Sequence, residues 1–583
     1  MSPTTSSTRH PGPITPAQRS VMPLNLLLRQ MLRRALAVLL LLALAIGVNT
    51  PTLAAAAGTP GGVDWKSPQG AAALDGLIAG SRNTGKPLLL YWGAVWCPPC
   101  NQLEATLFRR PEFIELSRRF VAVHLDGDGP GAQKLGAQYK VRGYPTMIVF
   151  DPRSRELTRL PGEVDAPVYL KALKAVLGEG DNTPVRPVAD LLAAARRGDA
   201  LPAADWRRLA WYSWDTDEAR LLPAAELPAV LATLGRASAT VDVAASTRLQ
   251  LKAVIASSDK GAAKLDDDAR FSAAAALLRL LGEAGAAREQ MDLVTGAVTD
   301  LAGSLSAAGT PQREQLVQVW AQSARRLQAD TTLSRADRLG ALQARVDLAA
   351  LGRLPGDTSI DADLRSDIRA AVAAADRDST DPAARQSVIP TAAHLLQSAG
   401  MGSESDALLR ASLSRSPAPY YLMSQLAGNA AKRGDKAVAL RWSAQAWQTA
   451  KGPATRLQWG AAHLARLIDL APDDSVQIEK VAATILREAA AVPDVYHERN
   501  ARSLQRIASR LTDWAGPAGA TERLNRLARA LDPVCAQLPA QDSARALCPP
   551  PPRPTRYPDS TDPPAPCCAG APAHRPIPAR PPC

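Results

Sequence analysis

Two patterns of hydrophobic and polar positions divide the chain. Between residues 64 and 178, short apolar runs alternate with segments whose apolar residues recur every three to four positions. The short runs predict buried strands, and the longer periodic segments predict helices. The predicted strands are 87–92, 120–125, 146–150 and 156–160. The predicted helices are 71–81, 98–108, 111–119, 131–139 and 166–177. This order, βαβ followed by ββα, predicts a layered α/β domain over residues 64–178.

A second, longer part of the chain lacks strand signals. From residue 187 to residue 531, helix-length segments follow one another and are separated by Pro, Gly, Asp and Ser. Asp435 is a good N-cap, and Gly434 is a natural end for the helix before it. This helix–turn–helix unit, within residues 417–470, resembles a tetratricopeptide hairpin. We therefore expect a large α-helical, solenoid- or tetratricopeptide-like region that holds partners or positions the α/β domain.

The N-terminal part has the composition of an export signal. Arg33 and Arg34 precede a continuous apolar run at 35–48, and residues 54–57 are all alanine. A positive segment, an apolar segment and a small-residue cleavage zone are the three parts of a secretory signal peptide. The apolar run is shorter than the roughly 20 residues that span a bilayer. We expect residues 1–57 to hold a cleaved signal peptide and the protein to be periplasmic or otherwise exported. The alternative is an N-terminal anchor in the inner membrane.

Two further segments are distinguished by composition. Residues 179–186 are rich in Gly, Asp, Asn and Pro, which predicts a linker. Residues 532–583 form a tail rich in Pro and Cys that has too few apolar residues for a core, so disorder is expected there. Five of the seven cysteines lie in this tail, at Cys535, Cys548, Cys567, Cys568 and Cys583. The first two are able to pair after export, which would close a modest loop.

The other two cysteines carry the candidate chemistry. Trp96-Cys97-Pro98-Pro99-Cys100 stands where a predicted strand ends and a predicted helix begins. Such a pair cycles between dithiol and disulfide with little backbone movement. Cys97 is expected at the helix N-terminus, where unpaired N–H groups and the helix dipole stabilise a thiolate. That thiolate attacks a substrate disulfide, and Cys100 then attacks Cys97 to release the reduced substrate.

A second motif completes a resemblance to a known family. Val141-Arg142-Gly143-Tyr144-Pro145-Thr146 is similar to the thioredoxin-fold loop that carries a cis-proline, and the first motif is similar to the family's Trp-Cys-x-x-Cys. Residues 101–113 further resemble the C-terminal thioredoxin-like domain of DsbD-type thiol:disulfide interchange proteins. The resemblance covers roughly a fifth of the chain. It implies a thioredoxin fold for residues 64–178, with Cys97 and Cys100 as the redox-active disulfide.

The resemblance also implies how substrate is bound. Pro145 would be cis and lie beside the dithiol, where its loop pairs with the substrate backbone. Trp96, Tyr144 and Thr146 are the further substrate-binding candidates, because they belong to the same two motifs. We expect the substrates to be disulfide-containing extracytoplasmic proteins, and the resemblance implies a membrane thiol-transfer protein as electron donor.

One position departs from the family pattern. Thioredoxins carry a buried, proton-relaying Asp six residues before the first cysteine, and Tyr91 stands there in this chain. Glu104, one helical turn after Cys100, matches an acidic residue near the dithiol in DsbD-type domains. Two interpretations of Glu104 stay open: a third catalytic residue that shuttles protons for Cys100, or an exposed helix glutamate.

Other classes of function find little support. The net charge of +12 is spread along the chain without a basic, aromatic patch, so no nucleic-acid partner is expected. A zinc site needs four ligands, and His124 is the only histidine between Cys100 and Pro187, so neither a metal nor a cofactor is expected. The stretch 126–129, Asp-Gly-Asp-Gly, resembles a calcium loop, but its twelfth position is Ala137 rather than Glu. A solvated turn is the expected structure of that stretch.

The leading hypothesis is therefore an exported thiol:disulfide oxidoreductase that reduces or isomerises protein disulfides. The alternative is a helical-repeat scaffold whose thioredoxin-like domain serves mainly as a protein-binding module. The alternative rests on the length of the helical region, about three times that of the α/β domain, and on Tyr91.

Overall fold

A computed structural model of the chain describes residues 62–160, 162, 165–178, 185–216, 221–258, 262–351, 359–542 and 544–545, without the side chains of 516–524. The chain divides into two compact units, Met1–Ala57 and Gly58–Cys583, and the described residues all belong to the second. The predicted signal peptide, most of the predicted linker and the tail from residue 546 onward lie outside the described residues.

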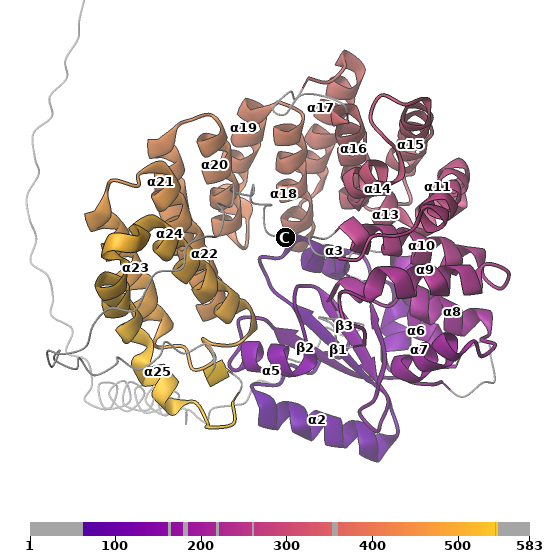
Figure 1. Cartoon of the computed structure of the whole chain (residues 1–583), viewed down its shortest axis with the longest axis horizontal. Helices are drawn as coiled ribbons and strands as arrows, with labels where there is room; N and C mark the ends of the chain where they lie inside the picture. The colour runs from indigo at the N-terminus through magenta and orange to yellow at the C-terminus, as the bar shows by residue number, and fades with distance from the viewer. Residues whose placement is uncertain are drawn as a thin grey trace, which may run out of the picture. The chain divides into compact units, whose positions relative to one another are not determined.

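The α/β domain is built on a four-stranded sheet. Its strands are β1 (Leu88–Gly93), β2 (Val121–Asp126), β3 (Thr146–Phe150) and β4 (Glu156–Leu160), in the spatial order β2-β1-β3-β4. Strand β1 pairs parallel with β2 and antiparallel with β3, and β4 pairs antiparallel with β3. The continuous apolar run of β1 is buried on both faces, which suits a central strand. Figure 1 shows this sheet with its helices.

Helices cover both faces of the sheet. Leu88, Leu90 and Trp92 face α2 (Ala71–Thr84) and α5 (Ala132–Tyr139). Leu89 and Tyr91 face the opposite side, since side chains alternate along a strand. That side is covered by α3 (Pro98–Ala105), α4 (Pro111–Ser117) and α6 (Ala166–Ala175). The predicted α/β fold is thereby confirmed.

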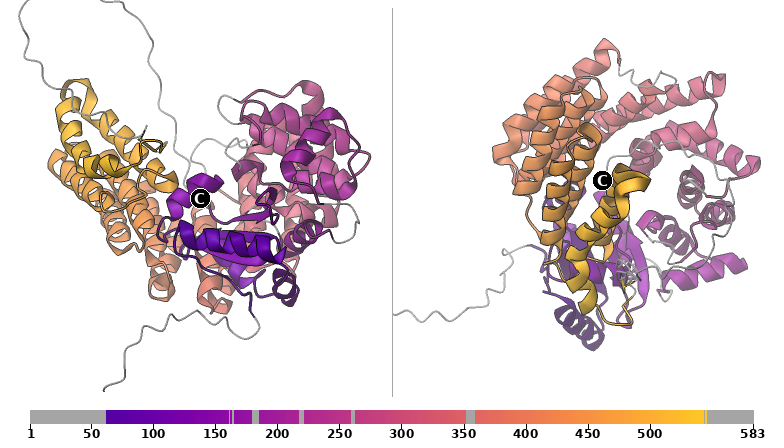
Figure 2. Two further views of the ribbon diagram at one scale, coloured as in Figure 1. Left: turned by 90° about the horizontal axis from the view of Figure 1, so that it is seen from below. Right: turned by 60° about the vertical axis from the view of Figure 1, so that its left-hand side comes forward.

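The rest of the described chain is helical, as predicted. From residue 185 onward every regular element in the described part is a helix, and most consecutive helices pack against one another (Figure 2). The α-helices are α7 (Val188–Arg197), α8 (Ala203–Ala210), α9 (Leu227–Ser238), α10 (Val243–Ser258), α11 (Asp267–Gly282), α12 (Ala284–Glu289), α13 (Met291–Gly296), α14 (Val298–Leu305), α15 (Pro311–Ala329), α16 (Arg335–Ala350), α17 (Ala362–Asp378), α18 (Pro382–Ser398), α19 (Gly402–Ser412), α20 (Pro419–Lys432), α21 (Lys436–Thr449), α22 (Pro453–Leu470), α23 (Ser475–Ala489), α24 (Glu498–Ala528) and α25 (Asp532–Gln537). Short 3-10 helices occur at η1 (Trp214–Thr216), η2 (Leu413–Arg415) and η3 (Arg529–Leu531). None of the described helices is both long and apolar enough to cross a membrane.

The hairpin with tetratricopeptide resemblance has the expected turn. Gly434 follows α20 with a φ of 80°, a conformation that glycine adopts without steric cost. The carboxylate of Asp435 accepts a hydrogen bond from the N–H of Val438 at 3.2 Å, so Asp435 is the N-cap of α21. Helices α20 and α21 therefore form the predicted antiparallel pair.

The helical region extends beyond the boundary that composition suggested. Helix α25 lies after residue 531, and Leu531, Val534 and Leu538 are buried against the preceding helices. These apolar residues recur at helical spacing, which outweighs the Pro-rich composition further along. Cys535 in α25 is disulfide-bonded, and its predicted partner Cys548 lies outside the described residues.

The α/β domain and the helical region share their cores. One hydrophobic cluster runs from the sheet through Leu173 of α6 to Val188 of α7 and Leu249 of α10. A second cluster joins Trp96 and Cys97 to helices between α20 and α25. Residues far apart in the sequence are therefore brought to the dithiol motif.

Candidate active site

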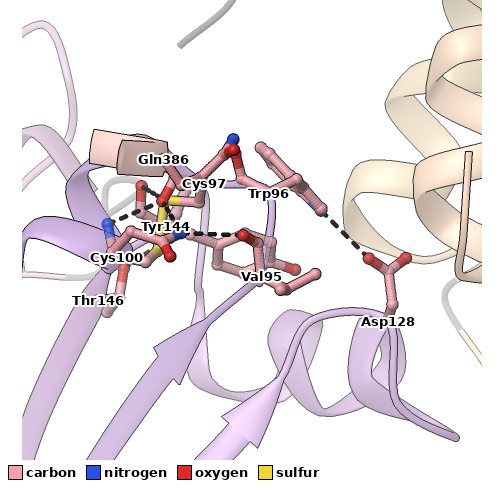
Figure 3. The surroundings of a disulfide bond; sticks show 10 residues. Val95, Trp96, Cys97, Cys100, Asp128, Tyr144, Thr146 and Gln386 are labelled. Carbon is pink, nitrogen blue, oxygen red and sulfur yellow. Dashed lines mark hydrogen bonds between the residues drawn. A yellow bond between two sulfur atoms is a disulfide. The ribbon is translucent and has the colours of Figure 1, made fainter. Parts of the chain in front are cut away.

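The two cysteines of the motif lie at the beginning of α3. Cys97 is the N-cap residue and Pro98 is the first helical residue, a position at which the missing N–H of proline costs nothing. Cys97 and Cys100 form a disulfide with a Cα–Cα distance of 5.3 Å (Figure 3). The backbone N–H of Cys100 donates to Cys97 Sγ at 3.2 Å. After reduction the same N–H would stabilise a Cys97 thiolate, as expected for the attacking sulfur.

The second motif lies beside this disulfide. The Tyr144–Pro145 peptide bond is cis, as the resemblance implied. Cys97 Sγ lies 3.5 Å from the carbonyl oxygen of Tyr144. Thr146 begins β3, and its hydroxyl donates to the carbonyl oxygen of Gly143 at 2.8 Å, which fixes the loop. The structure thus brings the candidate residues of both motifs together around the sulfur atoms (Figure 3).

Tyr91 occupies the place of the family's buried acid without replacing its chemistry. Its ring is stacked on His124 and meets Phe108 edge-on, each at 4.9 Å between centroids. Its hydroxyl is buried and has no hydrogen-bond partner. Burial raises the pKa of Tyr91 well above its ordinary value, and the charge of Glu104 raises it further. Tyr91 therefore stays protonated across the physiological range.

The environment of Glu104 agrees in part with each of the two interpretations, the proton shuttle and the exposed helix glutamate. Its side chain is half-buried on α3 rather than fully exposed. Burial raises the pKa of Glu104, the charge of Arg109 opposes this shift, and the charge of Asp381 adds to it. A carboxyl group with a raised pKa and partial contact with solvent has the properties of a proton carrier.

Residues of the helical region complete the surroundings of the dithiol, and sequence reasoning did not find them. The side-chain amide of Gln386, in α18, donates to the carbonyl oxygen of Trp96 at 2.8 Å (Figure 3). Tyr421 of α20 stacks on the Trp96 ring at 6.3 Å between centroids. The guanidinium of Arg499, in α24, lies over the rings of Trp96 and Tyr144 at 5.1 and 5.4 Å. Within these surroundings Cys97 is only 2% exposed and Cys100 is fully buried.

Asp128 connects the two parts of the chain at this place. Its carboxylate accepts hydrogen bonds from the Trp96 indole at 3.2 Å, the Thr455 hydroxyl at 2.6 Å and the Thr455 N–H at 2.8 Å. It also pairs with Arg499 at 2.8 Å, and both side chains are about nine-tenths buried. The prediction of a solvated turn at residues 126–129 is therefore wrong for Asp128. The reason is that its donors on Thr455 and Arg499 come from more than 300 residues later in the chain.

Asp128 acts as the N-cap of α22 from another part of the molecule. The local N-cap residue, Gly452, has no side chain, and Asp128 accepts the N–H of Thr455 in its place. Gly452 also permits the approach, because a Cβ there would lie 2.5 Å from Cγ of Asp128. A helix start at Gly452-Pro453 without a capping side chain was the one sequence signal that an outside acceptor was needed.

No metal site is formed in the described part of the chain. No group of three or more His, Cys, Asp or Glu side chains there is placed to hold a metal ion. His124, weighed as a zinc ligand, is instead packed on Tyr91, and burial lowers its pKa to about 4.

Comparisons with known proteins agree with this geometry. Residues 77–177 match the family model of the thioredoxin-like domain. The thiol:disulfide interchange protein DsbD of Pseudomonas fluorescens is 34% identical over 110 residues, 18% of this chain and 18% of that protein. DsbD 1 of Pseudomonas aeruginosa is 30% identical over 126 residues, 21% of each chain. The disulfide bond reductase DsbH of Chlamydia pneumoniae is 30% identical over 115 residues, 17% of this chain and 66% of that protein.

The similarity is confined to one part of each protein. This chain spans about a fifth of the length of the two DsbD proteins, and the match covers both motifs of the candidate site. Residues 77–177 are a thioredoxin-like domain. Together with the Cys97–Cys100 disulfide, the relatives support a thiol–disulfide oxidoreductase in general.

Proposed function

We propose, from the thioredoxin-like domain at residues 77–177, that the protein is an exported thiol:disulfide oxidoreductase which reduces or isomerises disulfides of extracytoplasmic proteins. The observation that carries the proposal is the Cys97–Cys100 disulfide at the start of α3, beside the cis Tyr144–Pro145 bond. Export rests on the apolar run at 35–48 that follows Arg33 and Arg34.

The proposed reaction transfers two electrons from the dithiol to the substrate. The Cys97 thiolate attacks one sulfur of a substrate disulfide, so that a mixed disulfide forms and the other substrate sulfur leaves as a thiolate. The Cys100 thiolate then attacks Cys97 Sγ, which restores the Cys97–Cys100 disulfide and releases the second substrate thiolate. A dithiol donor, proposed to be a membrane thiol-transfer protein, must return two electrons before the next cycle.

Three groups assist these steps in the proposal. The N–H of Cys100, already 3.2 Å from Cys97 Sγ, lowers the cost of the Cys97 thiolate. Glu104, with its raised pKa, accepts the proton that Cys100 loses before it attacks. The loop of Tyr144, Pro145 and Thr146 binds the backbone of the substrate, and Trp96 forms the neighbouring wall.

Trapping of mixed disulfides tests the proposal. In the full-length Cys100→Ala variant, Cys97 should form adducts with substrate proteins that persist until a reductant is added. The Cys97→Ala/Cys100→Ala variant is the matched control, because it lacks the attacking sulfur. The wild type should also reduce a model protein disulfide. The absence of both adducts and reduction would refute the oxidoreductase proposal.

The reduction potential of the Cys97–Cys100 couple decides the direction. A value near the thioredoxin end of the range, roughly −270 mV, supports a reductase, whereas a value near about −120 mV is typical of an oxidase. The measurement is an equilibrium titration against a glutathione or dithiothreitol buffer, read at these two cysteines by mass spectrometry.

A second candidate function is supported by the burial of the disulfide. Because Cys97 is 2% exposed, the domain is also suited to act as a binding module within a helical scaffold. This candidate predicts that a Cys97→Ser/Cys100→Ser variant keeps full activity in cells. It also predicts that deletion of the helical region, residues 187–531, abolishes that activity.

A further inference from the structure

We propose that the helical region forms a cap over the dithiol, that Asp128 holds the cap closed, and that a protein-sized substrate reaches Cys97 only after the cap opens. The cap is defined by four residues of the helical region: Gln386, Tyr421 and Arg499, which contact Trp96, and Thr455, which bonds to Asp128. The inference rests on the proposed function for the identity of the covered face, and it is tested by access to Cys97 rather than by turnover.

The cap occupies the face through which the substrate is proposed to bind. Arg499 lies over both Trp96 and Tyr144, and Tyr421 stacks on Trp96. Trp96 directly precedes Cys97, and the carbonyl oxygen of Tyr144 lies 3.5 Å from Cys97 Sγ, so both residues of the substrate-binding motifs adjoin the disulfide. A second protein chain cannot lie against Tyr144 while the cap side chains are there. Attack on a substrate disulfide requires the substrate sulfur to come into contact with Cys97 Sγ, and Cys97 is 2% exposed in the closed arrangement.

On the side of α22 and α24, polar contacts lie beside the apolar cluster that joins Trp96 and Cys97 to the helical region. Besides Asp128, the N–H of Gln133 donates to Asp494 at 3.0 Å, and Arg502 donates to the carbonyl oxygen of Arg142 at 2.9 Å. Polar contacts exchange with water at small net cost, whereas an apolar core does not. The polar contacts are therefore the ones whose removal by a single substitution loosens the cap while the apolar clusters stay in place.

Asp128 is the centre of the polar contacts. It holds the Trp96 indole, the N-terminus of α22 and the Arg499 guanidinium at the same time. Loss of this carboxylate leaves the Arg499 charge without its partner in a buried place, and it leaves the start of α22 without a cap. A change at Asp128 should therefore raise the open population more than a change at an exposed ion pair between the same two parts of the chain.

The experiment measures how fast Cys97 is alkylated in the reduced full-length protein. Two reagents are compared, N-ethylmaleimide and a maleimide attached to a polyethylene glycol chain of protein size, with Cys97 read at the peptide level by mass spectrometry. The wild type should react much more slowly with the large reagent than with the small one. In Asp128→Asn the rate with the large reagent should rise roughly tenfold or more, because that rate is proportional to the open fraction.

Two further variants separate opening from other effects. Arg499→Gln breaks the same ion pair, but it removes a positive charge where Asp128→Asn removes a negative one. Opening of the cap accelerates labelling of Cys97 in both variants. An electrostatic effect on the Cys97 thiolate would instead change the two labelling rates in opposite directions. Lys171→Gln is the matched control, because Lys171 forms an exposed ion pair with Glu289 at 3.1 Å between α6 and α12. Its labelling rate should equal that of the wild type. Melting curves followed by circular dichroism show whether each variant is folded.

The outcomes distinguish this inference from the proposed function. The cap is refuted if the large reagent labels wild-type Cys97 as fast as it labels Asp128→Asn, or if the Asp128 and Arg499 variants shift in opposite directions. Either result leaves disulfide reduction by the wild type untouched. Conversely, a protein with the expected labelling pattern that reduces no disulfide has a cap but is not an oxidoreductase.

Discussion

Gly452 offers a sharp test of the contact between Asp128 and α22. Gly452 has a φ of 85° and a ψ of 139°, and a Cβ there would lie 2.5 Å from Cγ of Asp128. In Gly452→Ala the backbone strain costs roughly 1–3 kcal/mol. In addition Asp128 must move, which removes the cap of α22, worth about 1 kcal/mol. The move also breaks its buried pair with Arg499, and breaking such a pair costs about 3–5 kcal/mol.

Gly70 is the matched control for the free-energy cost of the backbone strain. It is the N-cap of α2, its φ of 83° and ψ of 179° lie in the same glycine-only region, and its added Cβ would meet nothing closer than 4.0 Å. Gly70→Ala should therefore show only the strain. The expected difference between the two variants is about 4–6 kcal/mol, the sum of the lost cap and the broken pair, with Gly452→Ala the less stable.

Urea unfolding of both full-length variants measures that difference. The midpoint should fall further for Gly452→Ala, and the fluorescence of Trp96 should change with it because its ring contacts the cap. Equal losses of stability in the two variants, within about 0.5 kcal/mol, would show that the contact with Asp128 contributes nothing and would refute the reasoning.

Three other substitutions give independent predictions. Tyr91→Phe removes a buried hydroxyl without a partner, so the free energy of unfolding should stay equal or rise by up to about 1 kcal/mol, as measured by urea unfolding. Burial lowers the pKa of His463 from its ordinary value of 6.5 to about 4. The buried neutral imidazole therefore contributes its full stability above pH 6.5 and loses that contribution as the pH falls from 6.5 to 4. His463→Asn should reduce the loss of stability between pH 7 and pH 4.5 by roughly 2 kcal/mol, as measured by unfolding at both pH values. Arg248→Ala leaves Asp292, paired with it at 2.7 Å, as a buried charge, so the stability should fall by about 3–5 kcal/mol, whereas an unchanged melting temperature would contradict this.

The α/β domain could be predicted from the sequence because its signals are local. The run at 88–92 is buried on both faces, and a continuous apolar segment of that length is the pattern of a central strand. Strands β3 and β4 begin and end at the predicted residues because the turn at 151–155 separates them clearly. The neighbourhood of Cys97, Cys100 and the cis-proline follows from the same local order of elements.

The cap could not be predicted, because its contacts join distant segments. Asp128 and Thr455 are 327 positions apart, and Gln386 and Trp96 are 290 apart. Nothing in the spacing of residues 126–129 distinguishes a solvated turn from one that caps a remote helix. Gly452 carries part of the signal, since a helix start without a capping side chain needs an acceptor from elsewhere. The sequence does not say which acceptor that is.

The core shared by the two parts of the chain has a consequence for evolution and for protein engineering. Leu173 of α6 packs in one cluster with Val188 and Leu191 of α7 and Trp206 of α8. A fragment that ends at residue 178 would expose this apolar surface to water, and a helical region without the domain would expose its counterpart. A fusion that joins either part to a foreign neighbour is therefore expected to leave apolar surface uncovered. Residues 173 and 206 are expected to be substituted together, as contacting residues are in the interface of an obligate complex.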